Sequence, residues 1–333
     1  MYTSFDQTTL DKIVTLLKSH QSEFLSGQKL SDSLGQSRAA VWKNIKKLQS
    51  LGYKIESKPN LGYRLKQNTD LLFPWEISDG LQTDIIGGKI YYFDTIDSTQ
   101  NFALELAQKP HENGSVVVAK KQTRGRGRLG RKWVSPKGGI WLSILLRPNF
   151  EPSYTSLFPM LASLALSVAI EKTLHIKTGL KWPNDLTIDG DKVAGILIDA
   201  SIQSNLIDYL VIGVGINFKV KPGKITKEIK GQKYGIATLV KQDGKENPVR
   251  LMQQFLLELE HGYNDVISDK TGYIRKEWMK RSTTIGKNVT VSSSTGMQKG
   301  KAVGIDKTGA LLLSSRGKIL RVLAGDISYQ RQN

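Results

Sequence analysis

Hydrophobic residues follow three successive spacings along this chain of 333 residues, and that succession limits the fold more than any other feature. Residues 1–66 show mainly helical spacing, 84–265 alternate strand-like and helix-like segments, and residues from 284 onward form only short strand-like runs. An amphipathic helix repeats its apolar positions every three to four residues, whereas a half-buried strand repeats them every two. The chain is also too long for one ordinary domain. The order therefore predicts an α+β protein of several domains.

The N-terminal residues 1–66 are typical of a helical unit closed by a hairpin. Ser37 stands where it can cap the third helix, and Gly52 stands where that helix ends. The apolar spacing predicts three helices, over 10–17, 29–34 and 38–51. Residues 53–57 and 63–65 then alternate like paired strands. This is the layout of a winged helix-turn-helix, in which the helix after the tight turn lies in the major groove of DNA.

The exposed face of the third predicted helix is basic. Residues 1–66 contain 11 Lys and Arg against 5 acidic residues, a net charge of +6. Clustered cations on one helix face favour binding to phosphates. The candidates for DNA contact are Ser37, Arg38, Trp42, Lys43 and Lys46. The alternative is a helical interaction module that does not touch DNA.

The rest of the chain divides at changes of pattern. Residues 67–83 are polar, are interrupted by Pro74 and predict a partly packed linker. Residues 84–280 predict a mixed α/β domain whose sheet is built largely from hairpins, with long apolar helices over 156–174 and 249–266. Residues 281–333 predict a small β-barrel.

The composition excludes several classes of protein. The chain has no Cys, so it has no disulfide scaffold, no thiolate metal site and no cysteine nucleophile. Its four His are scattered, and we expect no zinc site. No apolar run reaches the roughly 18 residues of a membrane helix, and the N-terminus lacks the pattern of a signal peptide. We therefore expect a cytoplasmic protein with no membrane partner and no metal held by its own side chains.

The formal net charge of the chain is +18, from 48 Lys and Arg against 30 Asp and Glu. Such an excess favours an anionic partner, such as nucleic acid, a nucleotide phosphate or an acidic protein. The alternative is that the charge only keeps the protein in solution.

The most basic segment is 120–137, which contains eight Lys and Arg and no acidic residue. Gly125, Gly127 and Gly130 are interleaved with the basic residues. Glycine lets the backbone approach a ligand and present N–H groups to phosphate oxygens, and arginine offers a planar fork of donors. The position between two apolar strands favours a loop that closes over an anionic ligand. A solvated basic loop and an RNA contact are the alternatives.

Three shorter motifs complete the candidate site. In KWPND (181–185), Lys181 stands at the edge of an apolar strand as a point charge for a carboxylate or an α-phosphate, and Asp185 could orient it or help with Mg²⁺. In GVGIN (213–217), the glycines permit close backbone approach and Asn217 supplies a donor and an acceptor. DSTQ (97–100) opens a predicted helix, whose N-terminus can be capped or can hold a polar ligand group.

Together these segments resemble the biotin–protein ligase family. DSTQ, Gln122, GRGRLGR (125–131), KWPND, KVAGIL (192–197) and GVGIN match the family in order and spacing. The N-terminal helix-turn-helix is similar to that of the bifunctional bacterial form, which is also the repressor of the biotin operon. The family pattern often has Arg where this chain has Leu129, and its C-terminal basic residue is not clearly in register here.

The resemblance implies a fold and a reaction. The fold is a class II synthetase-like α/β domain followed by an SH3-like barrel. The carboxylate of biotin attacks the α-phosphate of Mg·ATP to give biotinyl-5′-AMP and pyrophosphate, and a lysine of biotin carboxyl carrier protein then takes the biotin. The implied partners are this carrier protein and operator DNA, and the implied assembly is a homodimer when biotinyl-AMP is bound.

The resemblance also implies roles for individual residues. The catalytic residues are Lys181, Arg126 and Arg128. The biotin-binding residues are Ser98, Thr99, Gln100, Gln122, Arg126, Gly127, Arg128 and Lys181. The nucleotide-binding residues are Arg128, Arg131, Asn217 and Thr238. Residues 234–239 occupy the place of a loop that covers the adenylate.

The chemistry of the residues agrees with this reaction. Both steps move charge onto phosphate oxygens and need no enzyme nucleophile, so positioning and stabilisation by Arg and Lys suffice. The alternatives are a non-catalytic ligand-sensing regulator, a lipoyl or octanoyl transferase, and a ligase whose N-terminal domain no longer binds DNA. The presence of Lys181 and of the basic loop argues against a non-catalytic regulator. The absence of Cys argues against the cysteine-dependent octanoyl transferases. The basic third helix argues against a ligase that no longer binds DNA.

Overall fold

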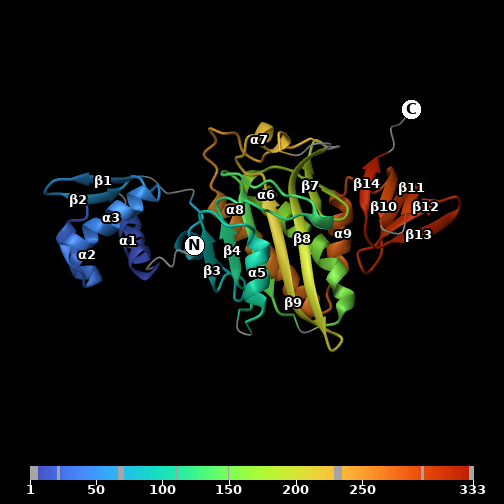
Figure 1. Ribbon diagram of the computed structural model, residues 1–333, viewed down its shortest axis with the longest axis horizontal. Helices are drawn as coiled ribbons and strands as arrows, with labels where there is room; N and C mark the ends of the chain where they lie inside the picture. The colour runs from blue at the N-terminus through green and yellow to red at the C-terminus, as the bar shows by residue number, and fades with distance from the viewer. Residues whose placement is uncertain are drawn as a thin grey trace. The chain divides into compact units, whose positions relative to one another are not determined.

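The computed structural model describes residues 7–20, 23–66, 71–109, 112–148, 150–228, 235–293 and 296–329. The chain divides into two compact units, Met1–Asp79 and Gly80–Asn333 (Figure 1). Each unit has its own buried apolar core.

The N-terminal unit is a helix-turn-helix followed by a hairpin. Its elements are α1 (Gln7–Ser19), α2 (Gly27–Leu34), α3 (Arg38–Ser50), β1 (Ile55–Lys58), β2 (Gly62–Leu65) and α4 (Pro74–Ser78). The Ser37 side chain accepts a hydrogen bond from the backbone N–H of Ala40 at 3.2 Å, so the expected cap of α3 is confirmed. Helix α2 begins two residues earlier than expected because Ser26 caps it through the N–H of Lys29. Strands β1 and β2 are antiparallel.

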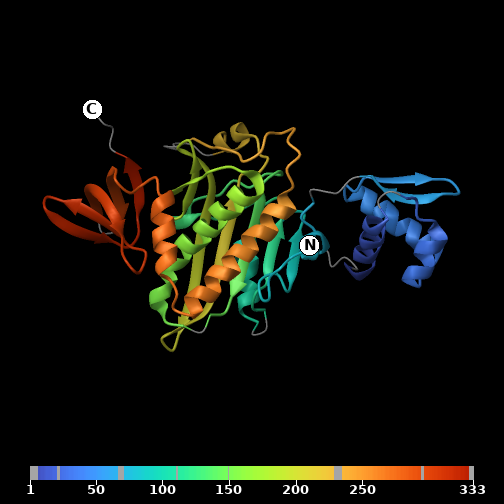
Figure 2. The same ribbon diagram turned by 180° about the vertical axis from the view of Figure 1, so that it is seen from behind.

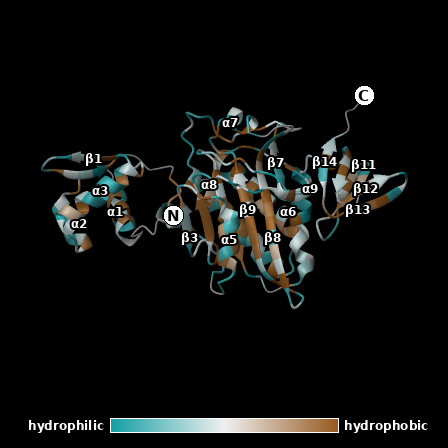
Figure 3. Cartoon of the chain, viewed as in Figure 1, coloured by the Kyte–Doolittle hydropathy of each residue, from teal (hydrophilic) through white to brown (hydrophobic). Residues whose placement is uncertain are grey.

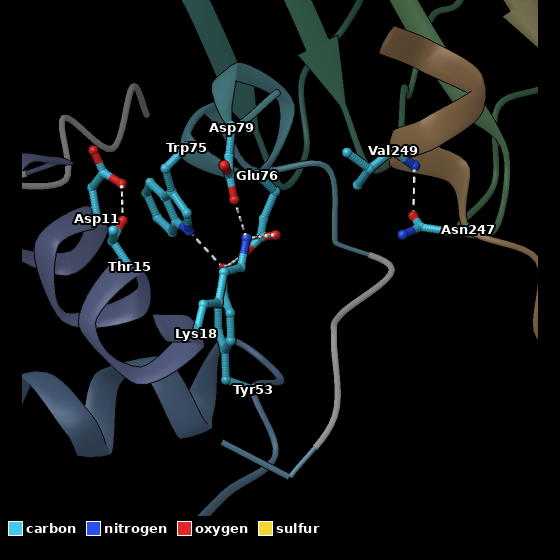
Figure 4. A network of polar contacts seen from close by, with 9 residues as sticks. All are labelled: Asp11, Thr15, Lys18, Tyr53, Trp75, Glu76, Asp79, Asn247 and Val249. Atoms are coloured by element: carbon cyan, nitrogen blue, oxygen red, sulfur yellow. Dashed lines mark hydrogen bonds and ion pairs between the residues drawn. The ribbon is translucent and has the colours of Figure 1, made fainter. Parts of the chain in front are cut away.

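A partly buried polar network attaches α4 to the core of the N-terminal unit (Figure 4). The Tyr53 hydroxyl donates to Glu76 at 2.7 Å and accepts a hydrogen bond from the Trp75 indole. Lys18 donates to Glu76 at 2.8 Å and to Asp79 at 2.9 Å. The described part of the segment predicted as a linker is therefore ordered as far as Asp79, and α4 belongs to the compact N-terminal unit.

The second unit is built on a mixed sheet. In the described part of the chain, seven strands form it in the order β3-β4-β5-β9-β8-β7-β6. Their bounds are β3 (Ile90–Phe93), β4 (Val116–Ala119), β5 (Ile140–Leu146), β6 (Gly179–Lys181), β7 (Asp185–Ile188), β8 (Asp191–Gln203) and β9 (Leu206–Ile216). Only β3 and β4 are parallel among these neighbours. The consecutive pairs β6–β7, β7–β8 and β8–β9 are the expected hairpins, whereas β5 pairs with β9.

Helices cover both faces of this sheet. Figures 1 and 2 place α5 on one face and α6 with α8 on the other. The Asn247 side chain accepts from the N–H of Val249 at 2.9 Å and caps α8 as expected (Figure 4). The helices and turns of this unit are α5 (Thr99–Ala107), η1 (Arg128–Gly130), η2 (Pro152–Leu157), α6 (Phe158–Leu174), α7 (Pro222–Thr226), α8 (Pro248–Ile267) and α9 (Gly272–Arg281).

The expectation that no apolar stretch is long enough to cross a membrane is wrong. By length and composition the helical stretch Tyr154–Leu174 could do so, and 67% of its most apolar window is buried inside the protein. Helix α6 packs against α8 and α9 on one side and the sheet on the other. A core helix covered in this way is apolar on all its faces, which accounts for the composition.

After α9 the chain forms a smaller antiparallel sheet. Five described strands follow the order β13-β12-β11-β10-β14. Their bounds are β10 (Asn288–Ser293), β11 (Gly296–Ile305), β12 (Leu311–Ser315), β13 (Lys318–Val322) and β14 (Asp326–Tyr329). The first four lie where short strands are expected, whereas β14 was not expected from the sequence. Figure 3 shows β8 and β9, two central strands of the larger sheet, coloured mainly as hydrophobic.

Candidate functional site

A cavity of about 660 Å³ opens in the second unit where the candidate motifs meet. Its wall comes from the N-terminus of α5, the basic segment, the 181–185 turn, strands β8 and β9, and β14. Of the predicted biotin, nucleotide and catalytic residues, those that line it are Ser98, Thr99, Gln100, Gln122, Arg126, Gly127, Arg128, Arg131, Lys181 and Asn217. Segments that are far apart in the sequence therefore share one cavity.

Thr238 is the predicted nucleotide-binding residue that does not line this cavity. Its hydroxyl donates to the Phe218 carbonyl at 2.7 Å and to the Asn217 carbonyl at 3.2 Å. The structure thus places Thr238 behind the wall, where it holds the backbone of Asn217. Tyr234, the first residue of the expected covering loop, lies outside the described residues.

One part of the cavity wall is a chain of neutral polar groups. Thr99 donates its backbone N–H to Gln122 Oε1 at 2.7 Å, and its hydroxyl lies 2.9 Å from that of Ser143. The Ser143 hydroxyl donates to Gln100 Oε1 at 2.9 Å. Thr99, Gln100 and Ser143 are all buried.

Ser98 stands at the N-cap of α5 without capping it. Its hydroxyl is fully buried and has no hydrogen-bond partner within the described part of the chain. A buried polar atom that lacks a partner costs free energy. Because Ser98 lines the cavity, a bound ligand is the natural source of that partner.

The glycines of 213–217 form the floor of the cavity. A Cβ on Gly213 would overlap the Gln100 amide, and a Cβ on Gly215 would overlap the Trp133 indole. These two positions therefore stay without a side chain because the groups above them lie directly on the sheet.

Another part of the wall is cationic. Arg128 reaches in from the basic segment and donates to Asn184 Oδ1 at 3.1 Å. Burial lowers the pKa of the Arg128 guanidinium, although Asp326 and Asp185 oppose that change. Next to Arg128, Leu129 has a left-handed backbone with φ 55° and is exposed.

Strand β14 joins the basic segment to the cavity wall. Arg131 donates to Asp326 at 3.1 Å and forms an ion pair with the same carboxylate. Burial raises the pKa of Asp326, but the hydrogen bond and charge of Arg131, with Arg128 and Lys192, outweigh it and hold that pKa below its ordinary value. No local pattern in the sequence predicts this contact, because it depends on the pairing of β14 with β10.

Lys192 is a second lysine of the wall that sequence reasoning missed. Its Nζ lies 2.6 Å from Asp185 Oδ1 and 5.0 Å from the centre of the Trp133 ring, and its side chain is 12% exposed. Asp185, expected to orient Lys181 or to help with Mg²⁺, is thus ion-paired with Lys192. The KVAGIL motif that begins at Lys192 was the available signal. Lys181 also lines the cavity, with its Nζ 5.1 Å from the centre of the Tyr329 ring.

In the N-terminal unit, the predicted DNA-contacting residues share the accessible side of α3 and its cap. Ser37, Arg38, Trp42, Lys43 and Lys46 are all exposed. The Lys46 ammonium lies 5.8 Å from the centre of the Trp42 ring. Val41, Ile45 and Leu48 on the other side of α3 are buried.

Three family descriptions match successive parts of the chain. An HTH domain matches residues 9–64, the Biotin/lipoate A/B protein ligase family matches 92–217, and the Biotin protein ligase C terminal domain matches 284–329. The three matched segments correspond to the helix-turn-helix, the sheet that carries the cavity, and the smaller antiparallel sheet.

Relatives and solved structures agree with these matches. The bifunctional ligase/repressor BirA of Bacillus subtilis is 38% identical over 96% of this chain and 99% of its own length. That of Escherichia coli is 30% identical over 98% of both. The biotin protein ligase from Aquifex aeolicus, solved in complex with biotin and ATP, is 28% identical, covers 74% of this chain and 100% of its own, and has a TM-score of 0.61. The chain therefore belongs to the biotin protein ligase family, among its bifunctional ligase/repressors.

Proposed function

We propose that this chain is an ATP-dependent biotin protein ligase that also represses transcription by binding DNA. It forms biotinyl-5′-AMP and pyrophosphate from biotin and ATP, and transfers biotin to a lysine of biotin carboxyl carrier protein. One observation carries the proposal: a single cavity has neutral hydrogen-bonding groups in one part and partly buried cations in another. This matches a ligand with a neutral ureido ring at one end and an acyl phosphate at the other.

The neutral part of the wall suits the biotin ring. A ureido group offers two N–H donors and a carbonyl acceptor, so it needs fixed partners of both kinds. Ser98 supplies an unpaired hydroxyl, and Thr99, Gln100 and Gln122 supply oriented groups beside it. We assign the ring to this end, which leaves the carboxylate of biotin to extend toward the cations.

The cationic part suits the first reaction step. A carboxylate oxygen of biotin attacks the α-phosphorus of ATP, a new P–O bond forms, and the bond to the bridging oxygen breaks so that pyrophosphate leaves with its electron pair. Arg128, Lys181 and Lys192 would stabilise the negative charge that develops on the phosphate oxygens. Arg131, Asn217 and Trp133 border the space left for the nucleotide.

The second step needs only an approaching amine. The acceptor lysine attacks the acyl carbon of biotinyl-5′-AMP, the C–O bond to AMP breaks, and the nitrogen loses a proton. Enclosure by the basic segment, which includes Arg126, Gly127 and Arg128, would keep water from the mixed anhydride until the carrier arrives.

Mg²⁺ is expected to enter with ATP. The carboxylates that line the cavity are each paired with a cation: Asp185 with Lys192, Asp326 with Arg131 and Glu228 with Lys132. They balance charge and do not fit a separate metal site. The phosphates of ATP would therefore carry the ion.

The DNA-binding function is assigned to residues 1–66. The exposed basic side of α3 would enter the major groove and the β1–β2 hairpin would act as the wing. We further propose that the chain dimerises on operator DNA when biotinyl-5′-AMP is bound, and that it acts in the cytoplasm. In this division α4 belongs to the N-terminal unit, 84–280 is the class II synthetase-like catalytic domain and 281–333 is an SH3-like barrel.

The test is a transfer assay with the full chain. Labelled biotin, ATP, Mg²⁺ and a biotin carboxyl carrier domain should give label on one lysine of the carrier, with release of AMP and pyrophosphate. Omission of ATP should abolish transfer. If biotin binds but neither adenylate nor labelled carrier forms, the chain is a ligand-sensing regulator and the enzymatic proposal is wrong.

A further inference from the structure

We propose that Asp199 is a positioning residue that fixes the hydrogen-bond direction at the biotin end of the cavity and anchors the basic segment above it. This inference rests on the proposed function, because it takes the neutral part of the wall as the site of the biotin ring. Asp199 lies on β8, opposite Val211 of β9, and does not itself line the cavity. No sequence motif pointed to it.

One carboxylate oxygen of Asp199 contacts two residues of the cavity wall. Its Oδ2 accepts a hydrogen bond from Gln100 Nε2 at 3.1 Å and lies 3.2 Å from a guanidinium nitrogen of Arg126. Gln100 belongs to α5, and Arg126 belongs to the basic segment. Asp199 therefore joins the sheet, the helix and the loop at one point.

The contact sets the orientation of the Gln100 amide. An amide can present its oxygen or its nitrogen in a given direction, and its neighbours decide which. Here the nitrogen faces two acceptors, the Asp199 carboxylate and the Val211 carbonyl, the latter at 3.2 Å. The amide oxygen must then face Ser143.

The orientation of the Gln100 amide also determines the direction of the neighbouring hydrogen bonds. Since Gln100 Oε1 can only accept, the Ser143 hydroxyl donates to it at 2.9 Å. Ser143 then has only lone pairs to offer Thr99, so the Thr99 hydroxyl hydrogen is directed to Ser143 or to Gln122 Oε1, which are 2.9 and 3.1 Å away. The half-buried Asp199 carboxylate, together with the Val211 carbonyl, thereby determines which cavity groups are donors and which are acceptors.

Removal of the Asp199 carboxylate charge by substitution should have two effects. With Asn at position 199, the amide nitrogen of the introduced asparagine can face Gln100, so only the Val211 carbonyl still requires a donor from Gln100. The Gln100 amide is then held less firmly in one orientation, and so are the hydrogen bonds of Ser143 and Thr99. Arg126 also loses its ion pair and, among the described residues, keeps its side-chain contact with Asn101 Oδ1 at 3.3 Å. Both effects weaken recognition of the biotin ring more than recognition of ATP.

The experiment compares Asp199→Asn and Asp199→Glu with Asp208→Asn in the full chain. Asp208 is a matched control because it lies on β9 and pairs with an arginine, Arg147, at 3.3 Å, away from the cavity. Biotin affinity is measured by calorimetry without ATP, and KM for biotin and for ATP by pyrophosphate release. Asp199→Asn should raise the Kd and KM for biotin about tenfold, as expected for a disturbed hydrogen-bond pair, with KM for ATP within about twofold.

A second probe separates positioning from general damage. In 2-iminobiotin an imine group replaces the ureido carbonyl, so the ring offers a donor where biotin only accepts. We expect the native protein to bind biotin more tightly than 2-iminobiotin. This difference in affinity should become smaller in Asp199→Asn, because a less firmly oriented Gln100 amide can face either a donor or an acceptor of the ligand. Asp199→Glu should restore the difference. A structural role alone would weaken both ligands equally.

The outcomes are distinct. Unchanged biotin affinity in Asp199→Asn overturns the inference, and so does an equal loss for biotin, 2-iminobiotin and ATP. If the wild-type chain binds biotin but forms no adenylate, the enzymatic proposal fails while the calorimetric comparison still tests Asp199. If the wild-type chain does not bind biotin, both fail.

Discussion

At the scale of single residues, the cavity holds polar groups that the protein itself leaves incompletely satisfied. Ser98 Oγ, Asn217 Oδ1 and the Trp133 indole N–H are buried without a hydrogen-bond partner among the described residues, and all three residues line the cavity. Folding usually pairs such atoms. Their shared position indicates that the ligand completes their hydrogen bonding.

Ser98→Ala separates ligand binding from stability. The substitution removes a buried hydroxyl that has no described partner, so the melting temperature of the ligand-free protein should stay the same or rise slightly. Biotin affinity should fall about tenfold because one hydrogen bond to the ligand is lost. Thermal melts with and without biotin, together with calorimetry, measure both quantities. A clear drop in the ligand-free melting temperature would show that Ser98 serves the fold instead.

Lys192→Ala should damage the chemistry more than Lys181→Ala. Lys192 is nearly buried against Asp185 and Trp133, so its charge acts where water is excluded. We expect its loss to slow adenylate formation by about 100-fold or more, as for other buried groups that stabilise a transition state. Lys181→Ala should mainly loosen retention of the adenylate. Single-turnover AMP formation and gel filtration of labelled adenylate check the two effects, and equal rates in Lys192→Ala and wild type would contradict the assignment.

At the scale of elements, β14 shows how a late strand completes a cavity built by earlier ones. Asp326 on β14 binds Arg131 of the basic segment, 195 positions away in sequence. The segment thus has one anchor on the small sheet and a second on Asp199 of the large sheet. An arginine-rich loop held at both sides is poised to enclose an anion.

The Asp326 anchor should depend on pH. The pKa of Asp326 is lower in the folded protein than its ordinary value, so its contribution to stability is present above about pH 4 and is lost as pH falls through the folded pKa. Asp326→Asn should therefore reduce stability at neutral pH, and its difference from wild type should vanish in acid. Thermal unfolding of both proteins across this range provides the measurement. A difference that persists unchanged at low pH would exclude the ion pair as its cause.

The sequence located the elements and motifs that carry local signals. Ser37 and Asn247 were predicted as caps because capping depends on a few neighbouring residues, and both predictions are confirmed. Helix α4 and β14 could not be predicted, since α4 is buried by contacts with Tyr53 and Lys18 and β14 exists through its pairing with β10.

Contacts in the cavity that depend on tertiary structure could not be predicted from the sequence either. The motif residues were expected together and do line one wall, whereas the pairing of Asp185 with Lys192 and the contacts of Asp199 depend on strand register. A one-residue shift in register would turn these side chains to the other face of the sheet. No local pattern encodes that register.

At the scale of the whole molecule, the chain combines two compact units with different chemistry. The N-terminal unit presents a basic, exposed side of α3, and the second unit encloses its cations in a cavity. We propose that the net charge of +18 serves two partners, DNA at the exposed side of α3 and a small anion in the cavity.

Single replacements of Arg38, Lys43 or Lys46 by Ala should weaken DNA binding without affecting adenylate formation. Each lost phosphate contact should reduce the slope of log K against log salt by about 1. Gel shifts on DNA upstream of biotin genes, at several salt concentrations and with or without biotin and ATP, test this. Unaltered affinity and salt slope in all three variants would favour an N-terminal unit that no longer binds DNA.

The glycines of the cavity floor, Gly213 and Gly215, limit how far the cavity can be enlarged by mutation. Neither position has a side chain to trim, so the cavity is already as deep there as a polypeptide backbone allows. Room for a bulkier vitamin analogue has to come from above, by shortening Trp133 or by moving the arginine-rich loop. Every replacement in the floor itself narrows the range of acids that the enzyme can accept.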